Sequence, residues 1–393
     1  MGRLEPEASQ TVHDVPLLSP ETPPMMLRSL LLTASAALAL GACQEGDQAE
    51  ATASAASSPA APARDAATAT VKTETRKFRD WLVVCDNGNA CSAFGPAPDG
   101  QDGWVRVSLD AGPDARPAVA AGFWGEQEEG GVGPFTLTID GRAFPAAHGI
   151  DPSNDQAYAG VIEGDALPVV DALASGRRLT LSQGAESTPI SLSGAAAALL
   201  WIDERQGRLS TTTALVRRGS RPASTVPAAP ALPVVRPAPA VAQTNLPKPV
   251  LSPAFEARAD VKQCRADTVQ SPTFQTAVTV DRLSADQELW GVPCSSGAYN
   301  YSMRYFVTGP NGADPQALSF PTSRTPDDEV VDSEYDPGSR TLRGFNKGRG
   351  IGDCGIDSLW VWTGRAFALQ AESEMRECWG VPSDQWPTTW RSR

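Results

Sequence analysis

Residues 78–95 read FRDWLVVCDNGNACSAFG, and this stretch predicts where the folded part of the chain begins. Residues 81–85 alternate between two faces of an extended strand, and residues 86–89 (DNGN) have the composition of a tight hairpin turn. Cys85 and Cys91 flank that turn. We therefore expect a β-hairpin closed by a bridge between these two cysteines.

Further strands are predicted at residues 104–109, 118–124 and 135–139. Two helices should interrupt them. Asp165 can cap the first, which should end near Ser175, and Ser193 can cap the second, over residues 195–206. Two short strands, 178–182 and 188–192, lie between the helices. Residues 76–219 are thus expected to form an α+β domain of antiparallel strands with two helices.

Residues 220–254 are rich in proline and alanine, which is typical of an extended linker. Residues 255–393 read as a mainly β domain, with alternation along residues 299–305 and a hairpin turn at Thr363-Gly364. We expect the two domains to fold separately. The alternative is that the apolar residues of the linker dock it along a domain edge.

Upstream, residues 25–43 read MMLRSLLLTASAALALGAC. A basic residue, a short apolar run and small residues before Cys43 are typical of a bacterial lipoprotein signal. The apolar run is too short to span a bilayer. Residues 25–42 are therefore expected to be cleaved, and the Cys43 thiol is expected to be acylated, which anchors the chain to a membrane.

Residues 1–24 are acidic and rich in proline, unlike the basic start of an export signal, so we expect them to be a start-site artefact. Residues 43–75 are rich in Ala, Ser and Thr and are predicted to be a disordered tether. The predicted location is the bacterial cell envelope, most simply the outer membrane, facing the periplasm or the cell surface.

The net charge of the 393 residues is −13, and no Lys/Arg cluster interrupts it. This balance argues against nucleic acid as a partner, because phosphates require a basic face. Seven cysteines less Cys43 leave an even number in an exported chain, which favours disulfides. Metal-binding CxxC pairs are absent from the sequence. We expect neither a metal nor a cofactor.

The linker leaves Cys85 and Cys91 upstream, so three pairings remain open for the other four cysteines. We favour the pairing of sequence neighbours. It joins Cys264 to Cys294 and Cys354 to Cys378.

The stretch quoted above, together with residues 104–117 (WVRVSLDAGPDARP) and 191–219 (SLSGAAAALLWIDERQGRLSTTTALVRRG), resembles the DUF1176 family of uncharacterised proteobacterial envelope proteins. The likeness extends to the C-terminus. The first half is also similar to the invasion-associated locus B family. These resemblances imply an architecture and a compartment, and they imply no active site.

A short repeat marks the second half. Residues 290–294 read WGVPC, and residues 378–382 read CWGVP. Tryptophans beside disulfides usually pack as core, which we favour over a carbohydrate-stacking platform. Trp386 and Trp390, near the tail, are expected to be more exposed.

Residues 344–355 form a glycine-rich loop in which G-x-G-x-x-G occurs. No strand-then-helix context surrounds it, so a dinucleotide site is not expected. Closely spaced N–H groups and two cations could bind a small anion, and the alternative is a turn held by Cys354. The candidate anion-site residues are Lys347, Arg349, Gly350 and Gly352.

Two charged runs have structural explanations. Residues 203–208 (DERQGR) could form a polar binding edge, but we favour a helix end stopped by Gly207. Five acidic residues crowd residues 327–334 and could include a catalytic carboxylate pair, but we favour a solvated, turn-forming run.

Catalytic motifs are missing. His148 is the only histidine beyond residue 24, and the sequence has no G-x-S-x-G, H-E-x-x-H or S-x-x-K. We therefore expect a membrane-anchored binding or structural interaction module with an envelope protein or glycan as partner. The alternatives are a carboxylate-dependent hydrolase of envelope glycan or peptide, and an inhibitor of foreign enzymes that attack the envelope.

Overall fold

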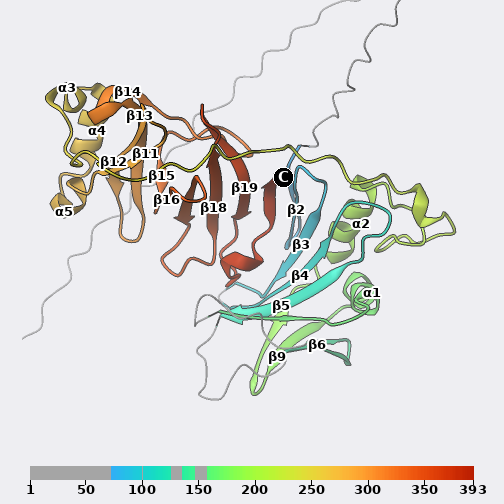
Figure 1. The fold of residues 1–393 in the computed structure, drawn as a ribbon. Helices are drawn as coiled ribbons and strands as arrows, with labels where there is room; N and C mark the ends of the chain where they lie inside the picture. The colour runs from blue at the N-terminus through green and yellow to red at the C-terminus, as the bar shows by residue number, and fades with distance from the viewer. Residues whose placement is uncertain (1–71, 100, 125–134, 147–156) are drawn as a thin grey trace, which may run out of the picture. The chain divides into compact units, whose positions relative to one another are not determined.

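The predicted hairpin is part of the first sheet of the protein (Figure 1). A computed structural model describes residues 72–99, 101–124, 135–146 and 157–393. β2 (Trp81–Cys85) and β3 (Cys91–Pro96) pair antiparallel, with Leu82 opposite Phe94 and Cys85 opposite Cys91. The two cysteines of the last pair form a disulfide. The turn between the strands is therefore closed covalently, as its sequence predicted.

The first half contains two antiparallel sheets. The first has the order β1-β2-β3-β4-β5-β8, and its remaining strands are β1 (Glu74–Phe78), β4 (Trp104–Leu109), β5 (Ala118–Trp124) and β8 (Ala157–Val161). The second sheet is β10 (Glu186–Ile190), β9 (Leu179–Gln183), β6 (Phe135–Ile139) and β7 (Arg142–Pro145). The two helices are α1 (Leu167–Ser175) and α2 (Ala195–Arg205). All the strand pairs are antiparallel.

The start of α2 differs from the prediction, because Ser193 makes no capping bond and the N-cap is Gly194 with φ 105°. A Cβ at Gly194 would lie 1.8 Å from the Phe78 carbonyl oxygen, so only glycine allows the β1–β2 turn to approach the helix. Asp165 accepts a bond from the Leu167 N–H at 3.1 Å, although α1 has Ala166 at its N-cap.

β2 is buried on both faces, and the two faces belong to different clusters. Trp81 and Val83 lie in the largest apolar cluster, with residues of α2. Leu82 and Val84 pack in another cluster that also contains residues of the second half. Those second-half residues are Met375, Val381 and Trp386.

The second half also contains two antiparallel sheets. The third sheet consists of β11 (Thr279–Arg282), β12 (Glu288–Ser296), β13 (Tyr301–Gly309), β14 (Ala313–Ala317) and the short β15 (Val330–Val331). The fourth consists of β16 (Glu334–Asp336), β17 (Thr341–Lys347), β18 (Gly355–Trp362), β19 (Phe367–Met375) and β20 (Thr388–Arg391). The described chain is thus mostly β, with four antiparallel sheets and a few helices.

Helices in the second half were not anticipated from the sequence. They are α3 (Pro253–Glu256), α4 (Ala259–Asp267) and α5 (Pro272–Gln275). α4 shows only two buried residues, Val261 and Cys264, and Cys264 bonds to Cys294 on β12. The disulfide, rather than a broad apolar face, therefore ties this helix to the sheet. Three short 3₁₀ turns complete the elements: η1 (Ala223–Thr225), η2 (Pro310–Gly312) and η3 (Ser383–Gln385).

The segment 220–254 makes backbone hydrogen bonds to the second half. Val235 N–H donates to the Arg393 carbonyl at 2.7 Å, and Ala238 N–H donates to the Trp362 carbonyl at 2.8 Å. These contacts favour the docked alternative for this segment. All described residues fall within one compact unit. Independent folding of the two halves, expected from composition, is untested, and the docked segment together with the apolar cluster that both halves share favours the opposite outcome.

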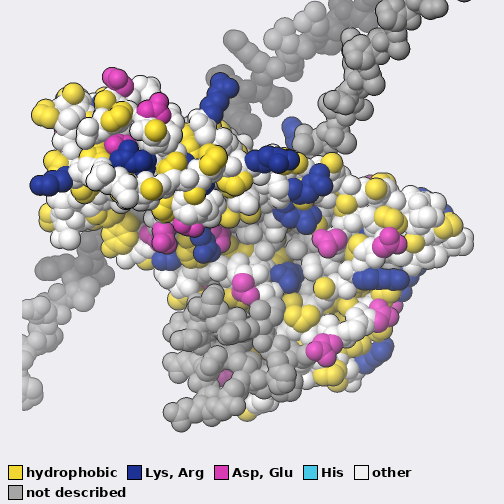
Figure 2. Space-filling model, in the orientation of Figure 1, with side chains coloured by type: hydrophobic (Ala, Val, Ile, Leu, Met, Phe, Trp, Pro, Cys, Tyr) yellow, Lys and Arg dark blue, Asp and Glu magenta, His cyan; other side chains and the backbone are white. Residues whose placement is uncertain are grey.

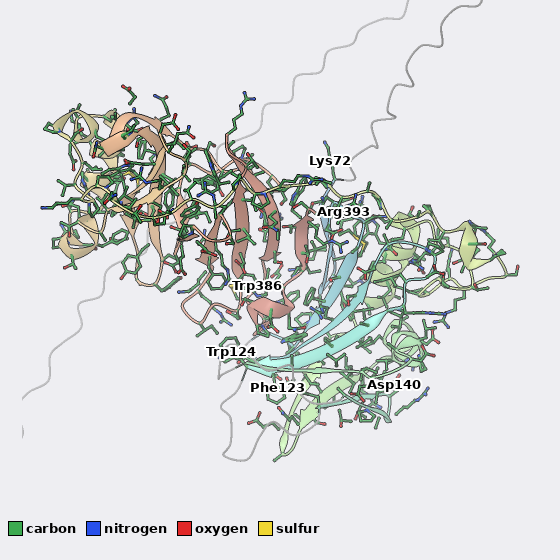
Figure 3. The ribbon with its side chains drawn as sticks, viewed as in Figure 1. Lys72, Phe123, Trp124, Asp140, Trp386 and Arg393 are labelled. Carbon is green, nitrogen blue, oxygen red and sulfur yellow. A yellow bond between two sulfur atoms is a disulfide. The ribbon has the colours of Figure 1, made fainter. Side chains whose placement is uncertain are left out.

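The tail tryptophans differ from the expectation. Trp386 (labelled in Figure 3) is only 4% exposed, and its ring stacks on Phe345 at 5.4 Å. Its indole N–H donates to the Val381 carbonyl. Trp390 is half-buried and donates to the Leu369 carbonyl. Trp386 was mispredicted because its burial depends on contacts with the first sheet, which local sequence does not encode.

Charged side chains of both signs are interspersed on the face seen in Figure 2. None of the described helices is long and apolar enough to cross a membrane. The predicted leader, signal and lipidation residue Cys43, most of the tether, and His148 lie outside the described residues.

Candidate functional site

The two cations of the glycine-rich loop are engaged by carboxylates of the same chain. Lys347 lies 3.2 Å from Asp332. Arg349 donates two hydrogen bonds of 2.6 Å to Asp353, which is fully buried. Gly352, with φ 75°, donates its N–H to the Arg349 carbonyl. An anion at this loop would have to compete with both carboxylates.

Asp353 also positions the motif CWGVP. Its carboxylate accepts the Gly380 N–H at 2.8 Å, while the Gly380 carbonyl accepts the Trp104 indole N–H at 3.1 Å. Gly380 has φ 73°, which favours glycine there. Cys378 is fixed by its disulfide to Cys354. Trp379 therefore sits between two fixed residues.

Trp379 lines a polar cleft of about 770 Å³. We call this the Trp379 cleft. One wall comes from the β1–β2 turn and the end of β3, and the other comes from the chain that follows β19. Its main polar and aromatic residues are Lys77, Arg79, Asp80, Asp99, Gln101, Ser191, Glu377 and Trp379.

The cleft carries charges of both signs in defined pairs. Lys77 Nζ lies 2.8 Å from Glu377 and 5.9 Å from the centroid of the Trp379 ring. Asp80 accepts a hydrogen bond from the Ser191 hydroxyl at 2.5 Å. Arg79 is held at φ 53°, a region that non-glycine residues rarely adopt. Arg79 and Asp80 form the two-residue turn between β1 and β2, where a positive φ is common.

The two tryptophans of the repeat differ in their surroundings. Trp290 is 2% exposed, donates its indole N–H to Glu288 at 2.9 Å and packs against Phe255. The core interpretation therefore holds for Trp290. Trp379 is only partly buried, with one side against the cluster around Trp104 and another on the cleft.

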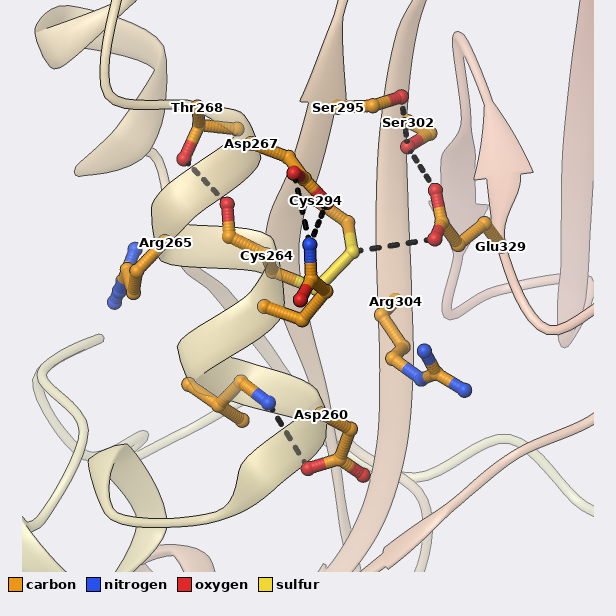
Figure 4. Close-up of a disulfide and its surroundings, with 12 residues drawn as sticks. Asp260, Cys264, Arg265, Asp267, Thr268, Cys294, Ser295, Ser302, Arg304 and Glu329 are labelled. Atoms are coloured by element: carbon orange, nitrogen blue, oxygen red, sulfur yellow. Dashed lines mark hydrogen bonds between the residues drawn. A yellow bond between two sulfur atoms is a disulfide. The ribbon is translucent and has the colours of Figure 1, made fainter.

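The three disulfides are the pairs expected from the sequence: Cys85–Cys91, Cys264–Cys294 and Cys354–Cys378. Around Cys264–Cys294, the Glu329 carboxylate lies 3.3 Å from the Cys294 sulfur and accepts the Ser302 hydroxyl at 2.5 Å (Figure 4). Both cysteines are buried. This bridge is a structural link between α4 and β12.

Among the described residues, one group of potential metal ligands lies close together, namely Asp353, Cys354 and Cys378. The two sulfurs are joined to each other, so neither is a thiolate available to a metal ion. Asp353 is already occupied by Arg349 and Gly380.

The charged run 203–208 stabilises neighbouring loops through buried hydrogen bonds. Asp203 and Arg208 are fully buried. Asp203 accepts the N–H groups of Leu215 and Val216, and Arg208 donates to the Gly112 carbonyl at 2.5 Å. Burial raises the pKa of Asp203 even though these bonds oppose the shift. The polar run thus links the chain beyond α2 to the loop after β4.

The acidic run 327–334 does not gather into one site. Asp328 pairs with Arg304 at 3.3 Å, Glu329 bonds Ser302, and Asp332 pairs with Lys347. These side chains therefore have separate partners, two of them on β13 and one on β17.

Sequence reasoning favoured Trp379 as a core residue, like Trp290, and did not predict its cleft. Lys77 and Glu377 are 300 residues apart in the chain. Neither lies in a motif, so no local pattern could bring them together. The one usable signal was the shift of the cysteine within the repeat, from after the tryptophan to before it.

The model of the family described as "Protein of unknown function (DUF1176)" matches residues 75–393. The chain belongs to the DUF1176 family. The match includes both walls of the Trp379 cleft, so the cleft is formed within the DUF1176 region.

This DUF1176 chain is 31% identical over 335 residues to the uncharacterized protein YpfG of Escherichia coli K12. The alignment covers 81% of this chain and 93% of YpfG. Among solved structures, it is similar to invasion associated protein B from Bartonella henselae, with a TM-score of 0.24 and 16% identity. That similarity covers 34% of this chain and 99% of the other.

Proposed function

We propose that this DUF1176 protein is a lipid-anchored envelope protein that binds glycan in the Trp379 cleft. The observation that carries the proposal is the combination of a partly exposed indole with carboxylates, cations and an amide in one polar cleft. In this proposal an α+β half, residues 76–219, and a mainly β half, residues 255–393, supply the two walls.

Sugars suit such a site because a pyranose ring has an apolar C–H face and polar edges. The C–H face stacks on an aromatic ring, and the hydroxyls bond to charged or amide groups. Trp379 offers the ring, while Asp99 and Gln101 are exposed at the opposite wall. A cleft of about 770 Å³ is large enough for a short oligosaccharide.

Binding is tested by titrating the purified chain with the N-acetylglucosamine tetramer in isothermal calorimetry. Stacking contributes roughly 1 kcal/mol or more, so Trp379→Ala should weaken binding about tenfold, while Trp379→Phe should keep most of it. Tyr299→Ala removes an exposed aromatic outside the cleft and serves as the matched control. Equal affinity of wild type and Trp379→Ala would show that the cleft does not bind this glycan.

A hydrolytic function is the second candidate, because Asp80, Asp99 and Glu377 all line the cleft. Two carboxylates that face each other across a glycosidic bond could act as acid and base. Mass spectrometry of the tetramer after incubation separates the two functions. Intact tetramer supports a binding module, and shorter products that disappear in Glu377→Gln support the hydrolase.

The anchor and the envelope location rest on the lipoprotein signal at residues 25–43. Cys43→Ser removes the thiol that acylation requires. The variant should leave the detergent phase in a phase-separation assay, whereas the wild type should stay in it. If both partition alike, the anchor proposal is wrong.

A further inference from the structure

A second cavity, of about 630 Å³, lies on the third sheet, away from the residues of the Trp379 cleft. It is bounded by α5, β11 and β13. We call it the Tyr301 pocket. The lining residues used below are Phe274, Tyr301, Met303, Tyr305, Asp332 and Ser333.

The pocket wall is largely aromatic because of strand periodicity. Tyr301, Met303 and Tyr305 alternate along β13, so their side chains share one face of the sheet. α5 brings Phe274 beside Tyr301, with ring centroids 5.0 Å apart. Tyr301 is nevertheless 43% exposed, and Tyr305 is 3% exposed. The wall therefore runs from a buried phenol to an accessible one.

Tyr301 is held at the pocket mouth by a strained residue. Asp332 has φ 40°, an unusual value for a residue with a side chain. Its carboxylate accepts the Tyr301 N–H at 2.9 Å, and its own N–H donates to the Tyr301 carbonyl at 2.8 Å. Lys347 balances the Asp332 charge. This cation of the glycine-rich loop thus helps to position an exposed ring.

Polar groups lie next to the pocket lining along the chain, beyond Ser333 and beyond Thr279. The Tyr305 hydroxyl bonds Ser333 at 2.9 Å, but the buried Tyr335 hydroxyl has no hydrogen bond in the described chain. Asp281 lies two residues beyond Thr279, which lines the pocket on β11. No cation or hydrogen-bond donor pairs with Asp281 among the described residues.

Electrostatics link Asp281 to the phenols. Burial raises the pKa of Tyr305 to about 12 and that of Tyr335 to about 12, and the Asp281 charge adds to both shifts. Burial also raises the pKa of Asp281 itself. Asp281 is half-buried and no cation of the described chain pairs with it, so a bound cation would compensate its charge.

We propose that the Tyr301 pocket binds a small compound that carries an ammonium group on an apolar frame. The rings of Phe274, Tyr301 and Tyr305 offer cation–π contacts. Asp281 is on the same strand as the lining residue Thr279, two positions further along, and it offers a negative charge behind the lining. An anion would be repelled by Asp281 and by a chain of net charge −13. A neutral apolar ligand would leave the Asp281 charge uncompensated.

The pocket shares no lining residue with the Trp379 cleft. This inference therefore does not rest on glycan binding, and either proposal can fail without the other.

The test is calorimetry of the purified full chain with choline and with 3,3-dimethylbutan-1-ol, its neutral isostere. Choline should bind saturably, and the isostere should bind about tenfold more weakly, because only the cation gains from the rings and the carboxylate. Choline binding should also weaken as acidification protonates Asp281.

Matched variants localise the site. Tyr301→Ala and Asp281→Asn should each weaken choline binding about tenfold, while Tyr301→Phe keeps the ring and should bind. Asp286→Asn makes the same charge change in the exposed turn between β11 and β12, and it should leave binding unchanged. Cooperative thermal unfolding of each variant shows that the fold is intact.

Two results would overturn the proposal: equal binding of choline and its isostere, or choline binding that is absent or insensitive to Tyr301→Ala. Flotation with phosphatidylcholine and phosphatidylglycerol vesicles identifies the source of the ammonium group. Tyr301-dependent flotation with phosphatidylcholine alone indicates a lipid headgroup, and binding of free choline alone indicates a soluble compound.

Discussion

The motif WGVPC at residues 290–294 and the motif CWGVP at residues 378–382 both contain the tetrapeptide WGVP, but their surroundings differ. Trp290 and Val292 belong to an apolar cluster that contains no residue of the first half. Val381 belongs to a cluster that also contains residues of the first sheet, and Trp379 faces the cleft. One motif is core, and the other joins two parts of the chain.

The two motifs differ because their cysteines have disulfide partners on different elements. Cys294 bonds to Cys264 on α4, which covers the strand that carries Trp290. Cys378 bonds to Cys354, next to Asp353, and Asp353 fixes the Gly380 N–H. The same short sequence can therefore bury its indole or present it, depending on which element the disulfide brings.

The largest effect should come from separating the two halves. Because Met375, Val381 and Trp386 cover the first sheet, we expect slow elastase cleavage within residues 223–248 and loss of cooperative melting in separated fragments. Separation should expose the motif at residues 378–382 to solvent and should leave the motif at residues 290–294 buried. Rapid cleavage to two fragments that each melt cooperatively would instead support separate domains.

Trp290→Ala should be the most destabilising single change in either motif. It removes a buried indole and leaves the buried Glu288 carboxylate with the Gly312 N–H as its remaining donor, so the free energy of unfolding should fall by about 3–5 kcal/mol. Urea unfolding followed by circular dichroism measures it. A loss below about 1 kcal/mol would show that Trp290 is not core.

Arg349→Gln should destabilise by about 2 kcal/mol, because it leaves the fully buried Asp353 without a counter-ion. Lys347→Gln is the comparison, since its partner Asp332 is 22% exposed, and its loss should stay below about 1 kcal/mol. Arg349→Gln should also shift Trp379 fluorescence through Gly380. Equal losses of unfolding free energy in the two variants would contradict the explanation that burial of the carboxylate sets the cost.

Trp379→Ala should lower the free energy of unfolding by only about 1–2 kcal/mol, since part of the indole already faces the cleft. The same change should weaken glycan binding about tenfold. Urea unfolding of both tryptophan variants in one series tests this ranking. The comparison between the motifs fails if Trp379→Ala is as destabilising as Trp290→Ala.

The smallest effect concerns pH. The pKa of Asp281 is raised by burial, so the folded state binds its proton more tightly than the unfolded state. Wild type therefore loses stability as pH rises from the unfolded pKa near 3.8 through the raised folded value. Asp281→Asn should remove this loss, with a gain below about 1 kcal/mol at neutral pH that vanishes in acid.

The measurement is a pair of urea titrations at neutral and acidic pH. The pKa of Tyr305 and that of Tyr335 are both about 12, so these phenols stay neutral across that range, and the difference between wild type and Asp281→Asn reports on Asp281. Asp286→Asn should show no such pH dependence.

Local sequence determined the features that depend on neighbours in the chain. Alternation and a DNGN turn specified the hairpin that Cys85 and Cys91 close. Periodicity also placed Tyr301, Met303 and Tyr305 on one face of a strand. Each of these inferences needs only a residue and those within a few positions of it.

Tertiary structure alone decided the sites. Trp386 was expected at the surface and is buried, because the first sheet lies against it. The cleft needs Lys77 beside Glu377, and the Tyr301 pocket needs Phe274 beside Tyr301. Burial and charge pairing depend on which distant segments meet, and no local pattern in the sequence encodes those meetings.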